Sequence, residues 1–286
     1  MAKTKILVTG ANGYIGQHVV AHLLEQPDTQ VIAADLANTG IDPRAEFLSV
    51  DVFSGDVDLY TRLGSPDVCI HLAWRDGFNH RSEYHIQSIP QHFTFIRTLL
   101  AGGLKQLAVM GSMHEVGYHE GMISEQTPCN PSSYYGIGKN TLRQVCLLLG
   151  KEFGTVIQWL RAYYLYGDDL KNHSVFTKLS EAAARGDRSF PFTSGLNQYD
   201  FQTIDELARQ IAAVVQQTEV QGIIECCSGQ PVRLKDKVEA FIAENGYAIE
   251  LAYGAFPDRP YDSPAIWGDP TKIRQVMAAV SQEGQH

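Results

Sequence analysis

The fold is decided by one stretch near the start of the chain, Thr9-Gly10-Ala11-Asn12-Gly13-Tyr14-Ile15-Gly16. It follows an apolar strand-like run, Lys5 to Val8, and opens an amphipathic helical pattern over Tyr14 to Leu24. Glycines at these intervals allow a tight turn, close approach of the backbone to a pyrophosphate, and close packing of helix on strand. The N–H groups and the dipole at the helix N-terminus would face the phosphates. Because strand, turn and helix all occur in order, the stretch predicts a dinucleotide-binding turn.

Asp35 ends the next strand-like run and bears on the choice of dinucleotide. A carboxylate there can accept hydrogen bonds from ribose hydroxyls, and it repels a 2′-phosphate. We therefore expect NAD(H) to be preferred, with NADP(H) left open. The alternative is that Asp35 only caps the loop that follows. Asp51 and Val52, after the third strand, are expected to contact the adenine in a similar way.

Strand-like and helical patterns alternate from the start of the chain. The strand-like runs are 5–8, 30–34, 47–50, 68–72, 107–110 and 155–160. Such alternation predicts parallel strands joined by right-handed helical crossovers, so the fold class is α/β, a Rossmann-type doubly wound parallel sheet. Helical patterns return at 204–217, 234–244 and 270–280 after a looser aromatic and glycine-rich stretch. We predict a Rossmann domain over residues 1–165 and a smaller C-terminal lobe over 166–286, interleaved with the sheet.

Composition excludes several classes of protein. Hydrophobic residues make up 44% and charged residues 19%, as in ordinary globular proteins, and no apolar run approaches the ~20 residues of a membrane span. A net charge of −9 without a basic cluster argues against nucleic acid as a partner. The five cysteines show no metal-site spacing, so we expect buried thiols and no metal. The N-terminal residues enter a strand pattern at once, so a secretory signal is not expected and a cytoplasmic location is the default.

A second motif, Tyr135-Gly-Ile-Gly-Lys139, opens another helical pattern. A Tyr and a Lys four residues apart share one face of a helix. A lysine ammonium beside a phenol favours the phenolate, which would bring proton transfer closer to neutral pH. Tyr135 could then hand a proton to a carbonyl oxygen as hydride arrives. The spacing is common by chance, and it gains weight here from the dinucleotide turn upstream.

With these motifs the chain resembles the extended short-chain dehydrogenase/reductase family, which comprises nucleotide-sugar epimerases, dehydratases and 4-ketoreductases. The resemblance runs nearly end to end. Its other carriers are His71-Leu72-Ala73, Gly111-Ser112, Arg161, Tyr166-Gly167, Asp200-Phe201 and Arg259-Pro-Tyr-Asp262. It implies that Ser112 orients the substrate carbonyl, that Tyr135 is the acid/base, and that Lys139 holds both Tyr135 and the nicotinamide ribose.

The resemblance also implies the ligand contacts. The cofactor residues would be Gly10, Asn12, Gly13, Tyr14, Ile15, Gly16, Asp35, Asp51, Val52, Leu72, Ala73, Tyr135 and Lys139. The candidate substrate contacts are Arg75, Met113, His114, Tyr164 and Arg259, with the C-terminal lobe binding the nucleotide sugar. Arg259 would pair with the substrate diphosphate, a role suited to its bidentate fork. Tyr164 belongs to an aromatic cluster that we otherwise expect to pack the core. A homodimer, with the Tyr135 helix in its interface, is implied as well.

The chain departs from the family pattern at Gly111-Ser-Met-His-Glu-Val-Gly117, which lacks the usual Val-Tyr-Gly ending. The family's Ser/Thr can fall on Ser112 or, after a one-residue shift, on Met113. We choose Ser112 because a hydroxyl can hydrogen-bond a ketone and a thioether cannot usefully do so. His114 is either a second acid/base or hydroxyl contact, or an inert loop histidine.

The choice of reaction depends on these departures. Resembling dehydratases carry Asp-Glu after their Thr, where this chain has His114-Glu115 after Met113. The Met-His-Glu-Val-Gly and Arg-Pro-Tyr-Asp-Ser-Pro stretches are most similar to reductases of dTDP-4-keto-6-deoxyhexoses in bacterial surface-sugar pathways. We therefore predict an NAD(P)H-dependent 4-ketoreductase of a nucleotide-linked 4-keto-6-deoxyhexose. The alternatives are a 4-epimerase or dehydratase with tightly held NAD, and a non-catalytic dinucleotide-binding protein, which the presence of Tyr135 and Lys139 disfavours.

Overall fold

The main layer of the protein is a seven-stranded parallel sheet. The computed structural model describes residues 3–167, 174–258 and 262–283. The strand order is β11-β7-β5-β4-β1-β2-β3. The strands are β1 (Thr4–Thr9), β2 (Thr29–Asp35), β3 (Glu46–Ser49), β4 (Val68–His71), β5 (Gln106–Ser112), β7 (Val156–Ala162) and β11 (Gly222–Cys226). The order turns back at β1, which pairs with β2 on one side and β4 on the other. The predicted Rossmann-type doubly wound sheet is confirmed.

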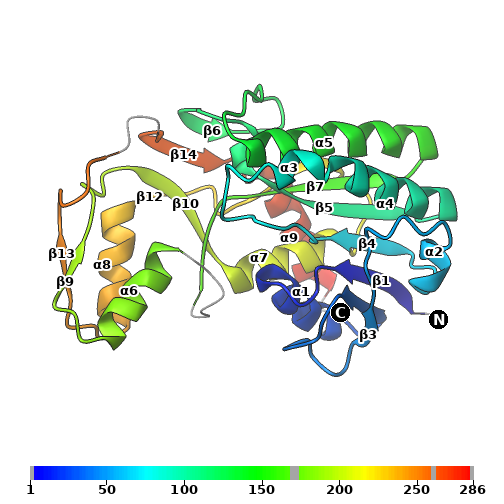
Figure 1. Ribbon diagram of the computed structural model, residues 1–286, viewed down its shortest axis with the longest axis horizontal. Coiled ribbons are helices and arrows are strands. Elements are labelled where there is room, and N and C mark those ends of the chain that lie inside the picture. Colours follow the sequence, from blue (N-terminus) through cyan, green and yellow to red (C-terminus); the bar gives the residue numbers. More distant parts are fainter. Residues whose placement is uncertain (1–2, 168–173, 259–261, 284–286) are drawn as a thin grey trace.

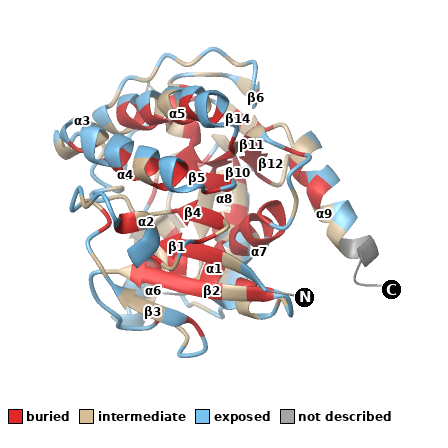
Figure 2. Cartoon of the chain, turned by 90° about the vertical axis from the view of Figure 1, so that its right-hand side faces the viewer, coloured by how far each residue is buried: buried red, intermediate tan, exposed pale blue. Residues whose placement is uncertain are grey.

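Helices cover both faces of this sheet (Figure 1). One face carries α1 (Tyr14–Leu24), α7 (Ile204–Val214) and α9 (Thr271–Glu283), and the other carries α2 (Leu59–Arg62), α3 (Tyr84–Gln87), α4 (Ile89–Gly102) and α5 (Tyr134–Phe153). Along β1, Ile6 and Val8 enter the core beneath α1, while Leu7 enters the core beneath α4. Figure 2 shows the central strands β1, β4 and β5 buried and the outer sides of α4 and α5 exposed. Burial on both faces explains why the strands read as continuous apolar runs.

A smaller lobe lies beside the sheet, at the left of Figure 1. It contains α6 (Val175–Ala184), α8 (Leu234–Glu244) and the pair β9 (Ser189–Pro191) and β13 (Glu250–Ala252). Phe176, Leu179 and Val238 belong to its separate apolar core. Five short strands form a second sheet: β6 (Gly121–Ile123), β8 (Tyr164–Tyr166), β10 (Gln198–Thr203), β12 (Pro231–Arg233) and β14 (Ala265–Gly268). The expected boundary at residue 165 falls inside β8, and α7, β11 and α9 return from the later residues to the main sheet.

The sequence placed α1 and α8 at their observed bounds, and two differences have local causes. The helix expected to reach Gln217 ends at Val214, because the Gln217 side-chain amide donates to the carbonyl of Val214 and caps the helix end. The strand β11 was missed because the buried Glu225 interrupts its short apolar run. Within the described ranges, no helix has the length and apolar character needed to cross a bilayer.

The turn between β1 and α1 requires its glycines. Gly10 has φ +68°, and a Cβ on it would lie 2.7 Å from the backbone nitrogen of Ala73. A Cβ on Gly16 would lie 2.2 Å from the Gly10 carbonyl oxygen. Both distances are far below van der Waals contact, so only glycine lets the turn, the helix and the end of β4 meet.

We therefore expect Gly16→Ala to lower the free energy of unfolding by about 1–3 kcal/mol, because backbone must move to admit the methyl group. Gly77→Ala is the matched control, since a Cβ there meets no atom within 4 Å. It should stay within about 0.5 kcal/mol of the wild type. Urea denaturation of the three proteins measures both values. Equal stability of the two variants would contradict this account of the turn.

Candidate active site

One cleft lies at the carboxyl ends of β1, β2 and β4. Its lining residues are Gly10, Gly13, Ala34, Asp35, Leu36, Val50, Asp51, Val52, Phe53, Leu72, Ala73, Trp74 and Arg75. Gly13 is the N-cap of α1, so the free N–H groups of that helix begin at the cleft. Gly10 lines the cleft with its backbone, and a side chain there would displace Ala73, which lines the cleft as well. The residues present therefore fit a dinucleotide held by this turn.

Asp35 has two roles in the structure. Its Oδ2 accepts the Asn12 N–H at 2.9 Å, and its Oδ1 accepts the Leu36 N–H at 2.7 Å. It thus caps the loop, as the alternative interpretation held, and it also lines the cleft. A carboxylate offers about four acceptor positions and these two bonds use half of them, so capacity for ribose hydroxyls remains. Asn12 also orders the loop, because its Oδ1 accepts the Thr39 N–H at 3.0 Å.

Other predicted cofactor and substrate residues lie elsewhere than expected. Tyr14 and Ile15 pack against the core at the start of α1 and do not line the cleft. Arg75 lines the cleft with Asp35, so the structure groups it with the cofactor residues. Met113 is a core residue with 6% of its surface exposed, which leaves little of it to touch a substrate.

Two further substrate candidates, Tyr164 and Arg259, come from later residues of the chain. Tyr164 is half-buried and packs on Tyr199 with ring centroids 4.1 Å apart, as the core interpretation of the aromatic cluster expected. Arg259 lies outside the described residues.

Ser112, Tyr135 and Lys139 come together as predicted. Ser112 ends β5, and its hydroxyl lies near enough to the Tyr135 phenol to lower the pKa of that phenol. Tyr135 and Lys139 lie one turn apart on α5, whose first turn is capped by Ser133. The Lys139 Nζ donates to the carbonyl of Met110 at 2.7 Å and lies 3.8 Å from the Trp74 ring centroid. The choice of Ser112 over Met113 agrees with this geometry.

Burial sets the protonation of both groups. Burial raises the pKa of Tyr135 to about 12, against the opposing effect of the Ser112 hydroxyl. Burial lowers the pKa of Lys139 to about 7, against the opposing effect of Glu115. The expectation that Lys139 would bring the phenol towards neutral pH is wrong for this structure. The Lys139 Nζ lies 5.9 Å from the Tyr135 ring centroid, and desolvation is the largest influence on the pKa of the phenol.

Three histidines and a tryptophan surround the Tyr135 ring. His80 is stacked on it with centroids 4.7 Å apart and planes 10° apart. The centroids of His85, His114 and Trp74 lie 5.2, 6.0 and 6.1 Å away. Sequence reasoning considered only His114 and missed His80 and His85. The available signal was the concentration of four of the ten histidines between residues 71 and 92.

A separate histidine pair, His71 and His92, lies in the core. The Thr9 hydroxyl and His71 Nδ1 are 2.8 Å apart, and His71 Nε2 is 2.9 Å from His92 Nδ1. Burial lowers the pKa of His92 to about 3 and that of His71 well below its usual range, so both are neutral at pH 7. In the described part of the chain, no group of three or more His, Cys, Asp or Glu could hold a metal ion.

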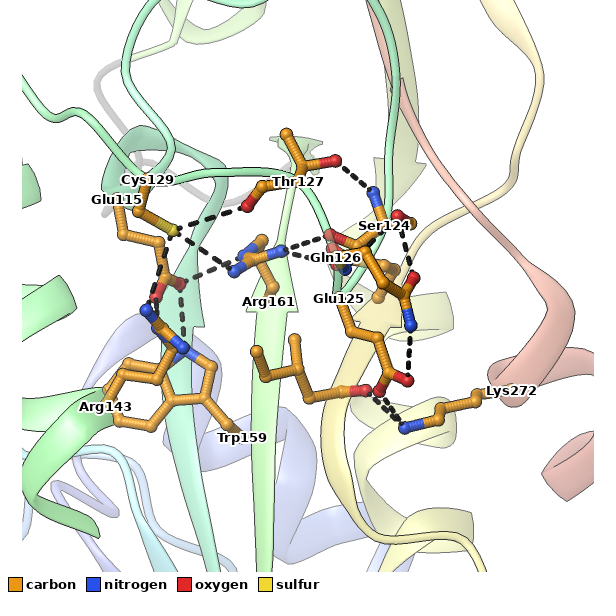
Figure 3. A network of polar contacts seen from close by, with 12 residues as sticks. Glu115, Ser124, Glu125, Gln126, Thr127, Cys129, Arg143, Trp159, Arg161 and Lys272 are labelled. Carbon is orange, nitrogen blue, oxygen red and sulfur yellow. Dashed lines mark hydrogen bonds and ion pairs between the residues drawn. The ribbon is translucent and has the colours of Figure 1, made fainter. Parts of the chain in front are cut away.

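A buried network of charges joins Glu115 to Arg143 and Arg161 (Figure 3). The Oε1 of Glu115 accepts the Ser112 N–H at 3.1 Å and the Trp159 Nε1–H at 2.8 Å. Arg161 Nε and Arg143 Nε form ion pairs with this carboxylate at 3.2 Å each, without hydrogen-bond alignment. Glu115 is fully buried, so its carboxylate links the end of β5 to α5 and β7.

The sequence of the chain matches a known protein family. The sequence profile of the NAD dependent epimerase/dehydratase family matches residues 6–227. The dTDP-6-deoxy-L-talose 4-dehydrogenase (NAD(+)) of Aggregatibacter actinomycetemcomitans is 41% identical over 274 residues, covering 92% of this chain and 98% of that protein.

Solved structures show the same fold. A UDP-glucuronic acid 4-epimerase from Bacillus cereus, in complex with UDP-glucuronic acid and NAD, superposes with a TM-score of 0.80 and 22% identity over 96% of this chain and 93% of its own. A dTDP-glucose 4,6-dehydratase from Streptomyces venezuelae has a TM-score of 0.78 and 20% identity over 95% and 90% of the two chains.

Asp35→Asn should raise the Kd for NADH by about tenfold or more. The ratio of the Kd for NADPH to the Kd for NADH should therefore become smaller. The amide removes the charge that repels a 2′-phosphate and weakens the acceptor for ribose hydroxyls. Fluorescence titration of both dinucleotides measures the change, and Asp42→Asn, outside the lining of the cleft, serves as the charge-matched control. If the wild type binds NADPH as tightly as NADH, Asp35 does not determine the choice of dinucleotide.

Proposed function

Because the chain belongs to the NAD dependent epimerase/dehydratase family, we propose that it is an oxidoreductase acting at C4 of a dTDP-linked 6-deoxyhexose. We propose further that it works as a 4-ketoreductase. The relative from Aggregatibacter is named for the oxidation of such a sugar with NAD⁺. Reduction of the 4-keto sugar by NADH is the same chemistry in the opposite direction, and a catalyst accelerates both.

The observation that carries the proposal is the Tyr135 phenol beside the dinucleotide cleft. With a pKa of about 12 it holds its proton at neutral pH, so it is ready to donate to a carbonyl oxygen. The Ser112 hydroxyl, which lies beside the same phenol, would orient that oxygen. When bound, the dinucleotide supplies the hydride, so that ketone, hydride and the phenol's proton give the 4-hydroxyl. A proton from solvent then restores Tyr135.

The position of Glu115 weighs against a dehydratase. Removing water across a sugar needs a further base that can reach a carbon-bound proton, and resembling dehydratases place a Glu at this point of the sequence. Here Glu115 has no exposed surface, and Ser112, Trp159, Arg143 and Arg161 surround its carboxylate. Freeing it for acid/base work would take the Glu115 carboxylate away from Arg143 and leave Arg161 with Glu225 as its partner, which costs free energy for groups this deeply buried.

Tyr135→Phe should lower turnover by about 10² or more, because the ring stays and only the proton donor is lost. Tyr134→Phe is the matched control, since Tyr134 precedes it on α5 and is exposed. The control should keep full activity, and both variants should bind NADH as the wild type does. Steady-state rates with a dTDP-4-keto-6-deoxyhexose measure the difference. A fully active Tyr135→Phe enzyme would end the proposal.

The reaction type is tested by the fate of the hydride. With dTDP-4-keto-6-deoxyglucose and NADH, the protein should oxidise one NADH per ketosugar and form a dTDP-6-deoxyhexose with a new 4-hydroxyl. NADH absorbance and chromatography of the product record the two amounts. An epimerase or dehydratase of this family returns the hydride to the sugar. Conversion of dTDP-glucose or a UDP-hexose without net change in NADH would therefore replace the reductase with one of those activities.

A further inference from the structure

His80 comes from the loop between β4 and α3, and no role was predicted for this residue from the sequence. Its ring is stacked on Tyr135, and the ring of His114 lies edge-on to it with centroids 4.4 Å apart. Two imidazoles from different parts of the chain thus meet over the ring of the proton donor. Both side chains are half-buried, so part of each still meets solvent.

The loop that carries His80 is held at several points. The Trp74 Nε1–H donates to His85 Nδ1 at 3.0 Å, and because tryptophan can only donate, the His85 proton must be on Nε2. That nitrogen then donates to the carbonyl of Asn79 at 2.9 Å. Next to it, the carbonyl of His80 accepts the Tyr135 N–H at 3.1 Å, which is one of the N–H groups that the first turn of α5 leaves unpaired. The His80 ring is therefore positioned before any substrate arrives.

Glycines in α5 make this arrangement possible. A Cβ on Gly136 would lie 2.3 Å from the carbonyl oxygen of His114, and a Cβ on Gly138 would lie 2.6 Å from that of His85. Glycine inside a helix costs about 1 kcal/mol relative to alanine, so two of them beside Tyr135 need a compensating contact. Here they let both histidine-bearing segments pack directly against the catalytic helix.

The two imidazoles are neutral and available. Burial lowers the pKa of His114 to about 4, and burial with the nearby His85 lowers the pKa of His80 as well. Among the described residues, no hydrogen bond to a ring nitrogen of either histidine is found. A neutral imidazole has one N–H donor and one acceptor nitrogen, which matches a hydroxyl group and suits an anion poorly.

We propose that His80, together with His114, is a specificity-determining pair that binds the sugar hydroxyl adjacent to the carbon on which Tyr135 acts. This inference rests on the proposed function. In a 6-deoxyhexose reacting at C4, C5 carries only the ring oxygen and a methyl group, so the adjacent hydroxyl is the one at C3. His80 accepts from or donates to that hydroxyl and thereby fixes which face of the ketone is presented.

The test measures the wild type and variants of His80, each with a substrate that has the C3 hydroxyl and with one that lacks it. For the wild type, kcat/KM should fall about ten- to a hundredfold with the 3-deoxy analogue of the dTDP-4-keto-6-deoxyhexose, because the histidines lose their partner. His80→Phe keeps a flat ring to stack on Tyr135 and removes both ring nitrogens. With the full substrate, the kcat/KM of this variant should be lower than that of the wild type by a similar factor. Its kcat/KM should be nearly the same with and without the C3 hydroxyl. His80→Gln, which keeps a donor and an acceptor, should recover part of the discrimination.

His119→Phe is the matched control, since His119 lies on the loop before β6 and bonds only to the carbonyl of Met122 through its ring. It should behave as the wild type with both substrates, and NADH binding should be unchanged in every variant. If His80→Phe keeps the wild-type discrimination, or if the wild type shows none, the role of His80 is overturned while the reductase stands. A wild type that does not turn over the full substrate at all would overturn the proposed function and this inference with it.

Discussion

The interaction on which the catalytic end of the sheet depends is the pairing of Arg161. This residue is fully buried in β7, and an unpaired guanidinium in that position would cost several kcal/mol. Glu115 lies beyond the end of β5 and Glu225 lies on β11, the two strands that flank β7. Burial raises the pKa of Glu225 to about 7, with Arg161 opposing the rise. Arg143 supplies a second cation, so two buried carboxylates are matched by two guanidinium groups. Ion pairs therefore fix the arrangement of this edge of the sheet together with apolar packing.

The same network determines where the reacting groups lie. Glu115 holds the Ser112 N–H with one oxygen, and it pairs with Arg143, which is one turn beyond Lys139 on α5. The strand end that carries Ser112 and the helix that carries Tyr135 are thus connected through one carboxylate. Gly111 makes room for it, because a Cβ there would lie 2.2 Å from Trp159 Nε1 and 2.9 Å from Glu115 Oε1. Glu115 thereby supports both the strand end that carries Ser112 and the helix that carries Tyr135.

Histidines illustrate how tertiary contacts divide one residue type between two roles. His71 and His92 satisfy each other's hydrogen bonds inside the core, and burial keeps them neutral. His80 and His114 are also neutral, but they remain half-buried beside Tyr135 with their ring nitrogens available. A satisfied imidazole stabilises the packing of its neighbours, whereas an available one can recognise a ligand. The difference lies in their partners and is not visible in the residues themselves.

The sequence by itself determined the features whose causes are local. Gly10 and Gly16 predict the dinucleotide turn because only glycine permits its backbone conformation and its close contacts. Tyr135 and Lys139 come together because residues four apart share one face of a single helix. The order of apolar runs predicts the parallel sheet, since each strand is buried on both faces. Only the tertiary structure decided the features that arise where distant segments meet: His80 over Tyr135, Met113 in the core, Arg75 on the cofactor side, and Glu115 enclosed by two arginines. The pKa of Tyr135 belongs with these, because the sequence reveals the neighbouring Lys139, while the direction of the shift is set by desolvation, which depends on every segment that packs around the phenol.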